Sequence, residues 1–475
     1  MEPKRKRQKK RCKHIESEKR IDFVTKFSDE VILHVFYYLS ERDLIQCTTV
    51  NSRWSRLAND EMLWKPLFFQ RFRDPILFDE HKAQLIHKRR TSVTRYGGSW
   101  KTKYRVNHNW LSGNCRISDV RTISRFAAPY TPEHLQFIHD VIFTVQPNSS
   151  TIEVWKYIQD EFSLLFTIKA TGDVSDSITF LKIFEGDAKN YLIAGNYNGG
   201  FTLWELQQGD ATDITELTSY QPCHPSLSEK CNQKVNVICM EYPIIVVCTE
   251  EMKLSIFNVH HSLQLVHQLQ SSNFWSPLIL DIQKINKTTQ PSWKIMTCFG
   301  IDLGNNSSSL GVQEIIVSPN KILSSRHGSI LSSDHFYLPS DSNIESITAM
   351  CYAPPYLITA HPNNTIKQFL VQDDDGTLQI NYKCTLYGHT FKVDALAVDV
   401  VRQRLISGDR SGIKVWDLEK ECCQVTIENH RNQSTMSELP LFEMNSLGFD
   451  EDKIIAAVQT EKRSMLRLWS FLLEE

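Results

Sequence analysis

The chain has 475 residues, of which 41% are hydrophobic, 10% aromatic and 23% charged, and its formal net charge is −2. This length suggests two or three domains, and the apolar content is enough for sizeable cores, which excludes a largely disordered polymer. Apolar runs are far shorter than the roughly 20 residues of a membrane helix, and the basic N-terminus lacks the apolar segment of a secretory signal, so neither a membrane partner nor secretion is expected.

The distribution of charge and the use of cysteine narrow the class of protein further. Residues 1–110 hold 25 Lys and Arg against 13 Asp and Glu, whereas the remainder holds 28 against 42. A basic front and an acidic remainder indicate two regions with different partners. The 12 cysteines follow no regular framework, which favours reduced thiols in the nucleus or cytoplasm. Cys223-His224 with Cys231 lacks a second ligand pair, so no metal site is expected.

Residues 1–20 form a basic arm that contains almost nothing apolar, and self-repulsion predicts disorder. Its densest part is Lys4, Arg5, Lys6 and Arg7. An exposed basic run of this kind is typical of a nuclear-import signal, which favours a location in both nucleus and cytoplasm. The alternatives are a solubilising tail or loose contact with phosphate backbones; specific nucleic-acid binding is not expected.

Residues 21–72 carry four short predicted helices. The expected capping residues are Ser28, Ser40 (with Asp43 completing a capping box), Asn51 and either Asn59 or Asp60. The first helix bears an apolar stripe at helical spacing, made of Val31, Ile32, Val35, Phe36 and Leu39. Pro66 falls inside the fourth helix, so we expect that helix to be kinked or split. So small a bundle buries little surface alone and needs a partner surface.

These caps and the spacing of two tryptophans resemble an F-box, the module that joins a substrate receptor to a Skp-type adaptor and through it to cullin and RING subunits. The family's usual Leu-Pro pair at the first turn is replaced here by Phe27-Ser28. The resemblance implies adaptor contacts from Leu33, Phe36, Leu39, Leu44, Val50, Trp54 and Trp64, with the two tryptophans also able to serve the module's own core. The alternative is an ordinary helical bundle packed on its own chain.

Residues 73–113 are predicted to be a helical linker. Ser99 as N-cap and Gly113 beyond the end bracket a helix that turns Trp100, Tyr104 and Val106 inward. A helix of this pattern is similar to the connector of F-box proteins that also carry WD repeats, where it implies a stiff spacer.

Residues 114–475 contain short β-branched and aromatic runs separated by turn residues, which predicts strands. The clearest unit runs from Gly388-His389 to Trp416-Asp417 and matches a WD repeat. In such repeats a His, a Ser or Thr, a Trp and an Asp share hydrogen bonds. His389, Ser407 and Trp416 match, whereas Ser411 occupies the position at which we expect the Asp.

Related closing strands indicate seven units. Their Trp-equivalent positions are 155, 204, 257, 369, 416 and 469, and the double gap after 257 leaves room for a seventh unit, which 309–313 can supply. Because one blade cannot bury both its faces, the units should stack into a closed β-propeller. The chain ends soon after the third strand of the last unit, so the missing outer strand should come from 117–125.

The sequence lacks the common phosphate-binding, dinucleotide-binding and hydrolase motifs, so no catalytic residue or cofactor is expected. In the WD-repeat receptors that this chain resembles, basic residues in the turn between the second and third strands of a blade hold phosphorylated substrates. Arg410 lies in such a turn, and Lys462 and Arg463 lie in the corresponding turn of the last unit. Because the other units lack such cations, the alternative is that these are solvated turn residues.

The sequence therefore predicts an N-terminal all-α F-box and helical linker followed by an all-β propeller. The resemblance implies a non-catalytic substrate receptor of a Skp–cullin–F-box ubiquitin ligase, with a protein substrate on the propeller face. The alternative function is a WD-repeat scaffold that acts outside any ligase.

Overall fold

The computed structural model describes 16 stretches of the chain: 26–72, 99–121, 134–158, 161–170, 176–186, 189–207, 210–222, 233–260, 262–285, 291–304, 307–319, 321–330, 346–374, 376–428, 443–459 and 464–473. Several predicted features lie outside these stretches, namely Lys4, Arg5, Lys6, Arg7, Cys223, His224, Cys231, Lys462 and Arg463. Contacts divide the chain into two units, residues 1–74 with 98–104 and residues 75–97 with 105–475.

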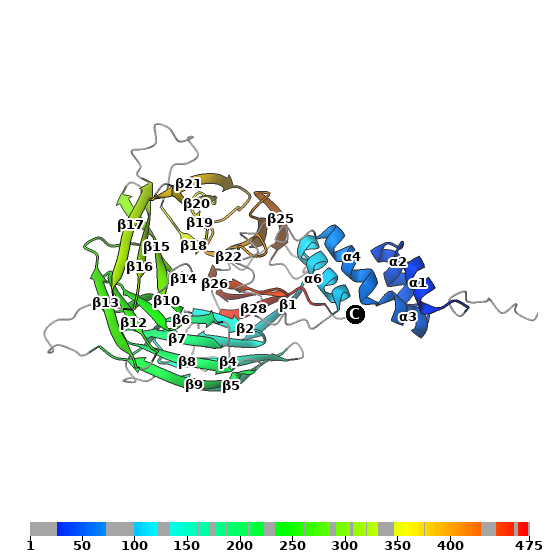
Figure 1. Cartoon of the computed structure of the whole chain (residues 1–475), viewed down its shortest axis with the longest axis horizontal. Coiled ribbons are helices and arrows are strands. Elements are labelled where there is room, and N and C mark those ends of the chain that lie inside the picture. The colour runs from blue at the N-terminus through cyan, green and yellow to red at the C-terminus, as the bar shows by residue number, and fades with distance from the viewer. Residues whose placement is uncertain are drawn as a thin grey trace, which may run out of the picture. The chain divides into compact units, whose positions relative to one another are not determined.

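The first unit is helical (Figure 1). It contains α1 (Asp29–Phe36), α2 (Glu41–Thr48), α3 (Ser52–Ala58), α4 (Glu61–Arg71) and the first residues of α6 (Trp100–Ser112). Its core is made of Ile32, Phe36, Leu44, Cys47, Leu57, Ala58, Leu63, Trp64 and Tyr104. The Trp64 indole also donates to the carbonyl of Ala58 at 2.7 Å, so the largest core side chain leaves its N–H satisfied.

The predicted caps are confirmed in three of the four helices. Ser40 Oγ accepts from the N–H of Asp43, Asn51 Oδ1 accepts from the N–H of Trp54, and Asp60 Oδ1 accepts from the N–H of Met62. Ser28 has the extended backbone of an N-cap but makes no side-chain cap bond. These bonds satisfy N–H groups that have no partner within their helices, which sets where each helix begins.

Of the two outcomes expected at Pro66, a kink or a split, the split is wrong and the kink stays a prediction. One helix runs from Glu61 to Arg71 with Pro66 inside it. Proline removes one hydrogen bond to the carbonyl four residues earlier, here that of Met62. Both Pro66 and Met62 are exposed, so we infer that solvent takes the place of the lost donor.

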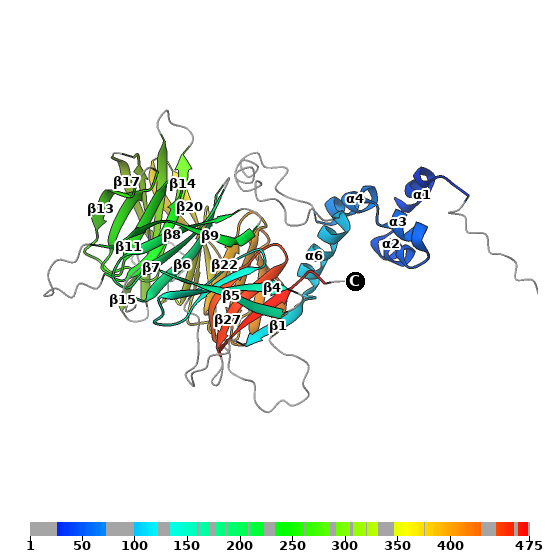
Figure 2. The same ribbon diagram turned by 90° about the horizontal axis from the view of Figure 1, so that it is seen from below.

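The second unit is a seven-bladed β-propeller (Figures 1 and 2). The first three blades are β2 (His134–Ile138), β3 (Val141–Val145), β4 (Thr151–Ile158) and β5 (Glu161–Lys169); β6 (Ile178–Glu185), β7 (Asn190–Asn196), β8 (Phe201–Gln207) and β9 (Asp210–Tyr220); and β10 (Val235–Glu241), β11 (Ile244–Thr249), β12 (Lys253–Asn258) and β13 (Gln264–Gln270).

The next three blades are β14 (Leu278–Ile285), β15 (Ser292–Gly304), β16 (Ser307–Val317) and β17 (Ile322–Ile330); β18 (Ala349–Ala353), β19 (Tyr356–Ala360), β20 (Ile366–Asp374) and β21 (Thr377–Leu386); and β22 (Ala395–Asp399), β23 (Arg404–Asp409), β24 (Gly412–Asp417) and β25 (Cys422–Glu428). The strand β16 contains 309–313, so the predicted hidden unit is confirmed as the fourth blade.

The seventh blade joins the two ends of the propeller sequence. It consists of β26 (Glu443–Phe449), β27 (Lys453–Gln459), β28 (Ser464–Ser470) and, as its outer strand, β1 (Arg116–Arg121). β1 pairs antiparallel with β28, with Arg116 opposite Ser470, which confirms the predicted closure. The first strands of successive blades contact one another in a ring, and β26 contacts β2. Apolar clusters between neighbouring blades form the core.

The helix α6 supplies side chains to both units. In the first unit, the rings of Tyr104 and Trp64 lie 5.5 Å apart. In the second, Trp110 stacks on Phe471 at 3.7 Å and its indole donates to the carbonyl of Glu451 at 2.8 Å. The helix has Ser99 as its N-cap and is followed by Gly113 at φ +70°, as the sequence predicts.

Candidate functional site

An apolar groove opens on the helical unit among α1, α2 and α3. Its volume is about 380 Å³. Six apolar side chains and two polar ones line it, namely Val35, Phe36, Leu39, Cys47, Val50, Trp54, Asp43 and Gln46. Val35 is 46% exposed and Val50 is 57% exposed, although both are large aliphatic residues. An unfilled groove with exposed aliphatic walls is the kind of surface that another protein covers.

The structure separates the predicted adaptor residues into two sets. Phe36, Leu44 and Trp64 are each 1% exposed and belong to the core of the unit. Leu44 and Trp64 belong to the core, a role that the sequence also allowed for Trp64, and Phe36 forms the floor of the groove; adaptor contact by these three stays a prediction. Leu39, Val50 and Trp54 line the groove, while Leu33 is half-buried outside its lining. Adaptor contact by these four stays a prediction.

Four groove residues were missed in the sequence as candidate contacts: Val35, Asp43, Gln46 and Cys47. The sequence feature that could have pointed to this surface was the width of the apolar stripe on α1. Ile32 and Phe36 of that stripe are buried, whereas Val31 and Val35 remain exposed. A stripe wider than the core can cover indicates a face reserved for a partner.

An ionic cluster fixes the start of α1, where the sequence departs from the F-box pattern. Arg53 donates to Asp29 Oδ1 at 2.7 Å and to the carbonyl of Phe27 at 2.9 Å. Hydrogen bonds from Arg56 and then Arg53 lower the pKa of the Asp29 carboxyl. The Phe27-Ser28 turn is therefore held by α3, which also presents Trp54 to the groove.

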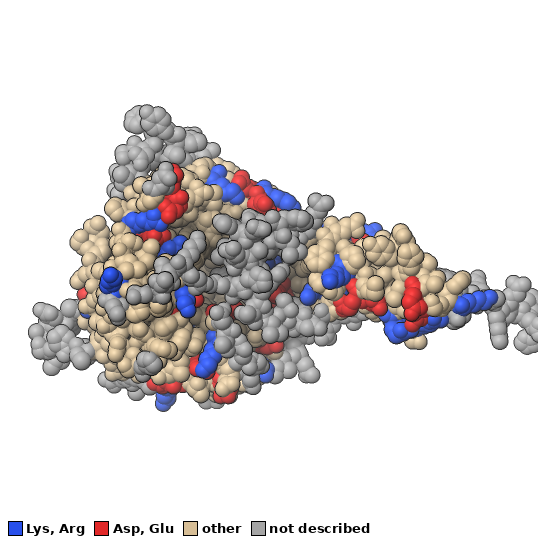
Figure 3. Space-filling view, in the orientation of Figure 1, with Lys and Arg blue, Asp and Glu red and all other residues tan. Residues whose placement is uncertain are grey.

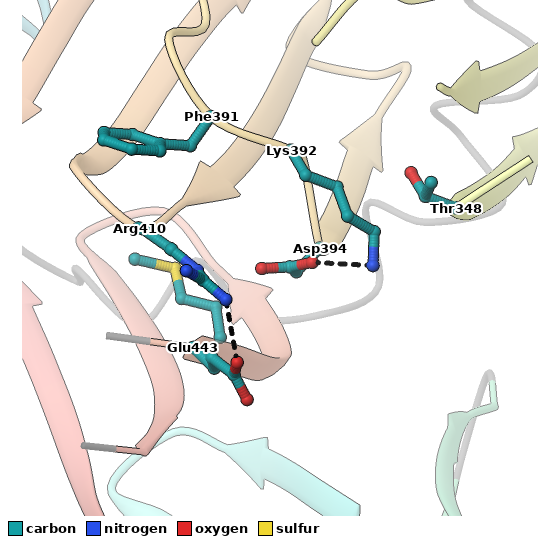
Figure 4. Close-up of a pocket in the computed structure, with 7 residues that line it drawn as sticks. Thr348, Phe391, Lys392, Asp394, Arg410 and Glu443 are labelled. Carbon is teal, nitrogen blue, oxygen red and sulfur yellow. Dashed lines mark hydrogen bonds and ion pairs between the residues drawn. The ribbon is translucent and has the colours of Figure 1, made fainter. Parts of the chain in front are cut away.

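A second cavity, of about 510 Å³, lies on the propeller (Figure 4). It lies where the loop before β22 and the turn between β23 and β24 meet the first residues of β26. Its lining residues are Thr348, Phe391, Lys392, Asp394, Arg410, Glu443 and Met444. The structure thus places Arg410 at a concave site, in the predicted turn between second and third strands.

The charges of this cavity are already paired. Arg410 bonds to Glu443 at 3.0 Å, and Lys392 approaches Asp394 at 3.3 Å. On the propeller face shown in Figure 3, basic and acidic side chains are likewise interspersed. A phosphate at Arg410 would compete with the Glu443 carboxylate, so the cavity favours a ligand of mixed charge over a purely anionic one.

The polar residues that match the WD-repeat pattern in the sixth blade form a buried network instead of a binding site. His389 Nδ1 donates to Asp409 at 2.8 Å, its Nε2 accepts from Ser407 at 2.6 Å, and the Trp416 indole donates to Ser407 at 2.7 Å. The expectation that Ser411 replaces the Asp of this network is wrong, because Asp409 supplies the carboxylate. Burial alone would raise the pKa of Asp409, but hydrogen bonds from His389 and Ser411 lower it to about 2.

Parts of this network recur in other blades. In the first blade the Trp155 indole donates to Thr144 at 3.2 Å, and in the fifth Thr359 contacts His361 at 2.8 Å. Thr144 and Thr359 hold the strand position that Ser407 holds, two residues beyond the partner of the aromatic residue. The network is therefore structural and marks a common blade design.

Within the described stretches, no three His, Cys, Asp or Glu side chains are placed to hold a metal ion. Similarly, none of the described helices is long and apolar enough to cross a membrane.

The fold and the helical groove together define an F-box protein with a β-propeller, and comparison with known proteins agrees. A family model described as the F-box protein pof12 beta-propeller matches residues 115–439, and one described as F-box-like matches residues 29–70. The chain therefore belongs to the family of F-box proteins with a propeller of the pof12 kind.

Individual relatives are more distant. The chain is 27% identical over 154 residues to an F-box protein of Saccharomyces cerevisiae, covering 29% of this chain and 23% of that protein. It is 28% identical over 97 residues to F-box protein dre-1 of Caenorhabditis elegans, covering 20% of this chain and 10% of that protein. The chain thus spans less than a quarter of either relative. A solved structure, the computationally designed Ika8 protein, aligns with 72% of this chain and 97% of its own at 15% identity and a TM-score of 0.40.

Proposed function

We propose that this chain is the substrate-recognition subunit of a Skp–cullin–F-box ubiquitin ligase. In this proposal the helical unit docks to a Skp-type adaptor, which joins it to cullin and RING subunits, and the propeller binds a protein substrate. The chain would do no bond chemistry itself. It would raise the concentration of the substrate's lysines beside the ubiquitin-carrying enzyme.

The observation that carries the proposal is the apolar groove in a unit that matches the F-box model. Four short helices bury little surface alone, and this unit leaves Val31, Val35 and Val50 about half exposed. An adaptor that covered them would remove apolar area from water, which is the main driving force of association.

The test is a pull-down of the full chain with a purified Skp-type adaptor, beside a Val35→Asp, Val50→Asp double variant. Both side chains are exposed, so the variant should fold, while its carboxylates would be desolvated in the interface. We expect binding to weaken at least about thirtyfold, which corresponds to about 2 kcal/mol lost at an interface centre.

Met62→Asp is the matched control, because Met62 is 72% exposed but does not line the groove. It should bind as the unaltered chain does. If the unaltered chain fails to bind, the scaffold function outside a ligase replaces this proposal. Equal binding by the groove variant and the unaltered chain would show that the adaptor binds outside the groove.

For the substrate we propose the propeller cavity at Arg410 as part of the binding face. Its paired charges would suit a peptide that carries both acidic and basic groups. Lys462 and Arg463, which lie outside the described residues, remain proposed contributors from the sequence pattern. A substrate captured from cells by the unaltered chain should be lost from an Arg410→Glu, Lys392→Glu variant that still binds the adaptor; retention of the substrate would exclude this cavity.

We further propose a nuclear and cytoplasmic location, with Lys4, Arg5, Lys6 and Arg7 as the import signal. A fluorescent fusion that lacks residues 1–13 should lose nuclear enrichment relative to the full chain. Unchanged enrichment would leave the arm as a solubilising tail.

A further inference from the structure

Each blade ends in an outer strand whose second edge is unpaired within its own sheet. Such edges are normally protected by charged side chains or by a neighbouring segment that covers them, because free backbone groups can pair with another chain. Two outer strands show this protection. β9 carries Asp213 and Glu216. β17 contacts β21 of the next blade, and Arg326 on β17 bonds to Asp373 on β20 of that blade at 2.7 Å.

The outer strand of the first blade, β5, lacks such protection from 162 to 168. Its residues Leu164, Leu165 and Phe166 are 49%, 40% and 37% exposed. No charged residue, Gly or Pro occurs from 162 to 168. Among the side chains that the structure describes on the other outer strands, large exposed apolar residues occur singly, as Leu217, Leu265 and Leu323.

The sequence of β5 is complementary to itself in antiparallel order. Pairing two copies about Leu165 sets Glu161 opposite Lys169, Phe162 opposite Ile168, Ser163 opposite Thr167, and Leu164 opposite Phe166. Hydroxyl meets hydroxyl, and apolar meets apolar, at the pairs from 162 to 168. Cross-strand pairs of these kinds stabilise antiparallel sheets, and the central Leu165 meets its own copy.

We propose that two copies of this chain associate through β5, joining their first blades into one eight-stranded antiparallel sheet. Twofold symmetry requires a self-complementary surface, which this strand supplies. Leu165 lies at a bulge opposite β4, where Val154 pairs with Phe166 and Trp155 with Leu164. The two four-residue segments on either side of it therefore carry the backbone pairing between copies. The inference is independent of the proposed ligase function.

One pair of nine-residue strands is a small interface compared with the roughly 1,200–2,000 Å² of stable complexes, so the dimer should be weak and concentration-dependent. Sedimentation velocity of the full chain over a micromolar concentration series should therefore show a rise from the monomer to the dimer mass. A chain that stays monomeric throughout overturns the proposal, and would leave the β5 edge to a strand of some other protein.

Charge substitutions at the symmetry centre test the register. Leu165→Lys sets like charges opposite each other and should abolish the dimer, and so should Leu165→Glu. An equimolar mixture of these two variants should restore it, because Lys then faces Glu. Restoration also shows that both variants are folded.

The matched control is Leu265→Lys on β13, an exposed leucine of another outer strand, which should leave the dimer unchanged. A dimer that persists in Leu165→Lys, a mixture that stays monomeric, or equal loss in Leu265→Lys would each overturn the proposal.

Discussion

At the scale of single residues, Ser407 connects two buried side chains of the sixth blade, His389 and Trp416. Ser407→Ala would leave both without this partner in a site that excludes water. An unsatisfied buried group costs about 1–3 kcal/mol, so we expect the free energy of unfolding to fall by about 2 kcal/mol in chemical denaturation.

Ser411→Ala is the control for Ser407→Ala. Its hydroxyl bonds to Asp409 from a partly exposed turn, and its backbone N–H bond to the same carboxylate remains. A loss as large as that of Ser407→Ala would mean that the turn, and not the buried network, stabilises the blade.

The seventh blade has a tryptophan, Trp469, at the position equivalent to Trp416, but it has no hydroxyl at the position equivalent to Ser407. Trp469 lies opposite Ile454, so Ala456 holds the position of Ser407, and the Trp469 indole N–H has no partner within the described part of the chain. Ala456→Ser should supply the missing acceptor and raise the free energy of unfolding by about 1 kcal/mol.

Ala457→Ser is the matched comparison for Ala456→Ser. Ala457 packs in the apolar cluster between the seventh and first blades, where the indole N–H of Trp155 already donates to Thr144, so a new hydroxyl there should lower stability. If both serines destabilise equally, the indole does not bond as it does in the sixth blade.

At the scale of elements, the interface between β2 and β6 should make stability depend on pH. Burial lowers the pKa of His134 on β2 from 6.5 to about 4. The unfolded chain therefore binds a proton at this residue below about pH 6.5, whereas the folded chain binds it only near pH 4. The stability that neutral His134 contributes is fully present above about pH 6.5 and is lost as the pH falls from there to about 4.

A His134→Gln variant should remove this dependence. One proton contributes a slope of at most about 1.4 kcal/mol per pH unit, so the stability of the unaltered chain should fall more steeply between pH 6.5 and about 4. Denaturation at several pH values measures both slopes; identical slopes would show that His134 does not carry the effect.

At the scale of the whole molecule, β1 and the end of α6 close the propeller from the N-terminal side. Asp119 on β1 pairs with Arg467 on β28 at 2.6 Å, and Asn109 and Trp110 bond to carbonyls of Phe471 and Glu451. These contacts lie more than 300 residues apart in the sequence.

A chain of residues 99–475 should therefore melt at least about 5 °C above a chain of residues 122–475. The shorter chain exposes the edge of β28 and loses the packing of a buried tryptophan, which alone costs about 3–5 kcal/mol. Thermal melts of the two chains make the comparison, and equal melting temperatures would show that closure contributes little.

Much of the architecture could be predicted because its signals are local. Ser40, Asn51 and Asp60 cap helices by bonds to N–H groups two or three residues away. The spacing of the closing aromatic residues marks each blade, since every unit repeats the same strand order. The outer strand of the seventh blade could be predicted by counting strands, because its C-terminal segment supplies only three and a blade needs a fourth.

Only the tertiary structure decided which side chains remain available for binding. Val35 is exposed and its neighbour Phe36 is buried, although both continue one apolar stripe. The sequence determined that Arg410 lies in a turn, but its pairing with Glu443 depends on two blades meeting. The physical reason is the same in both cases. Caps and the hairpins within a blade form from neighbours in the chain, whereas exposure and ion pairing depend on residues brought together by folding.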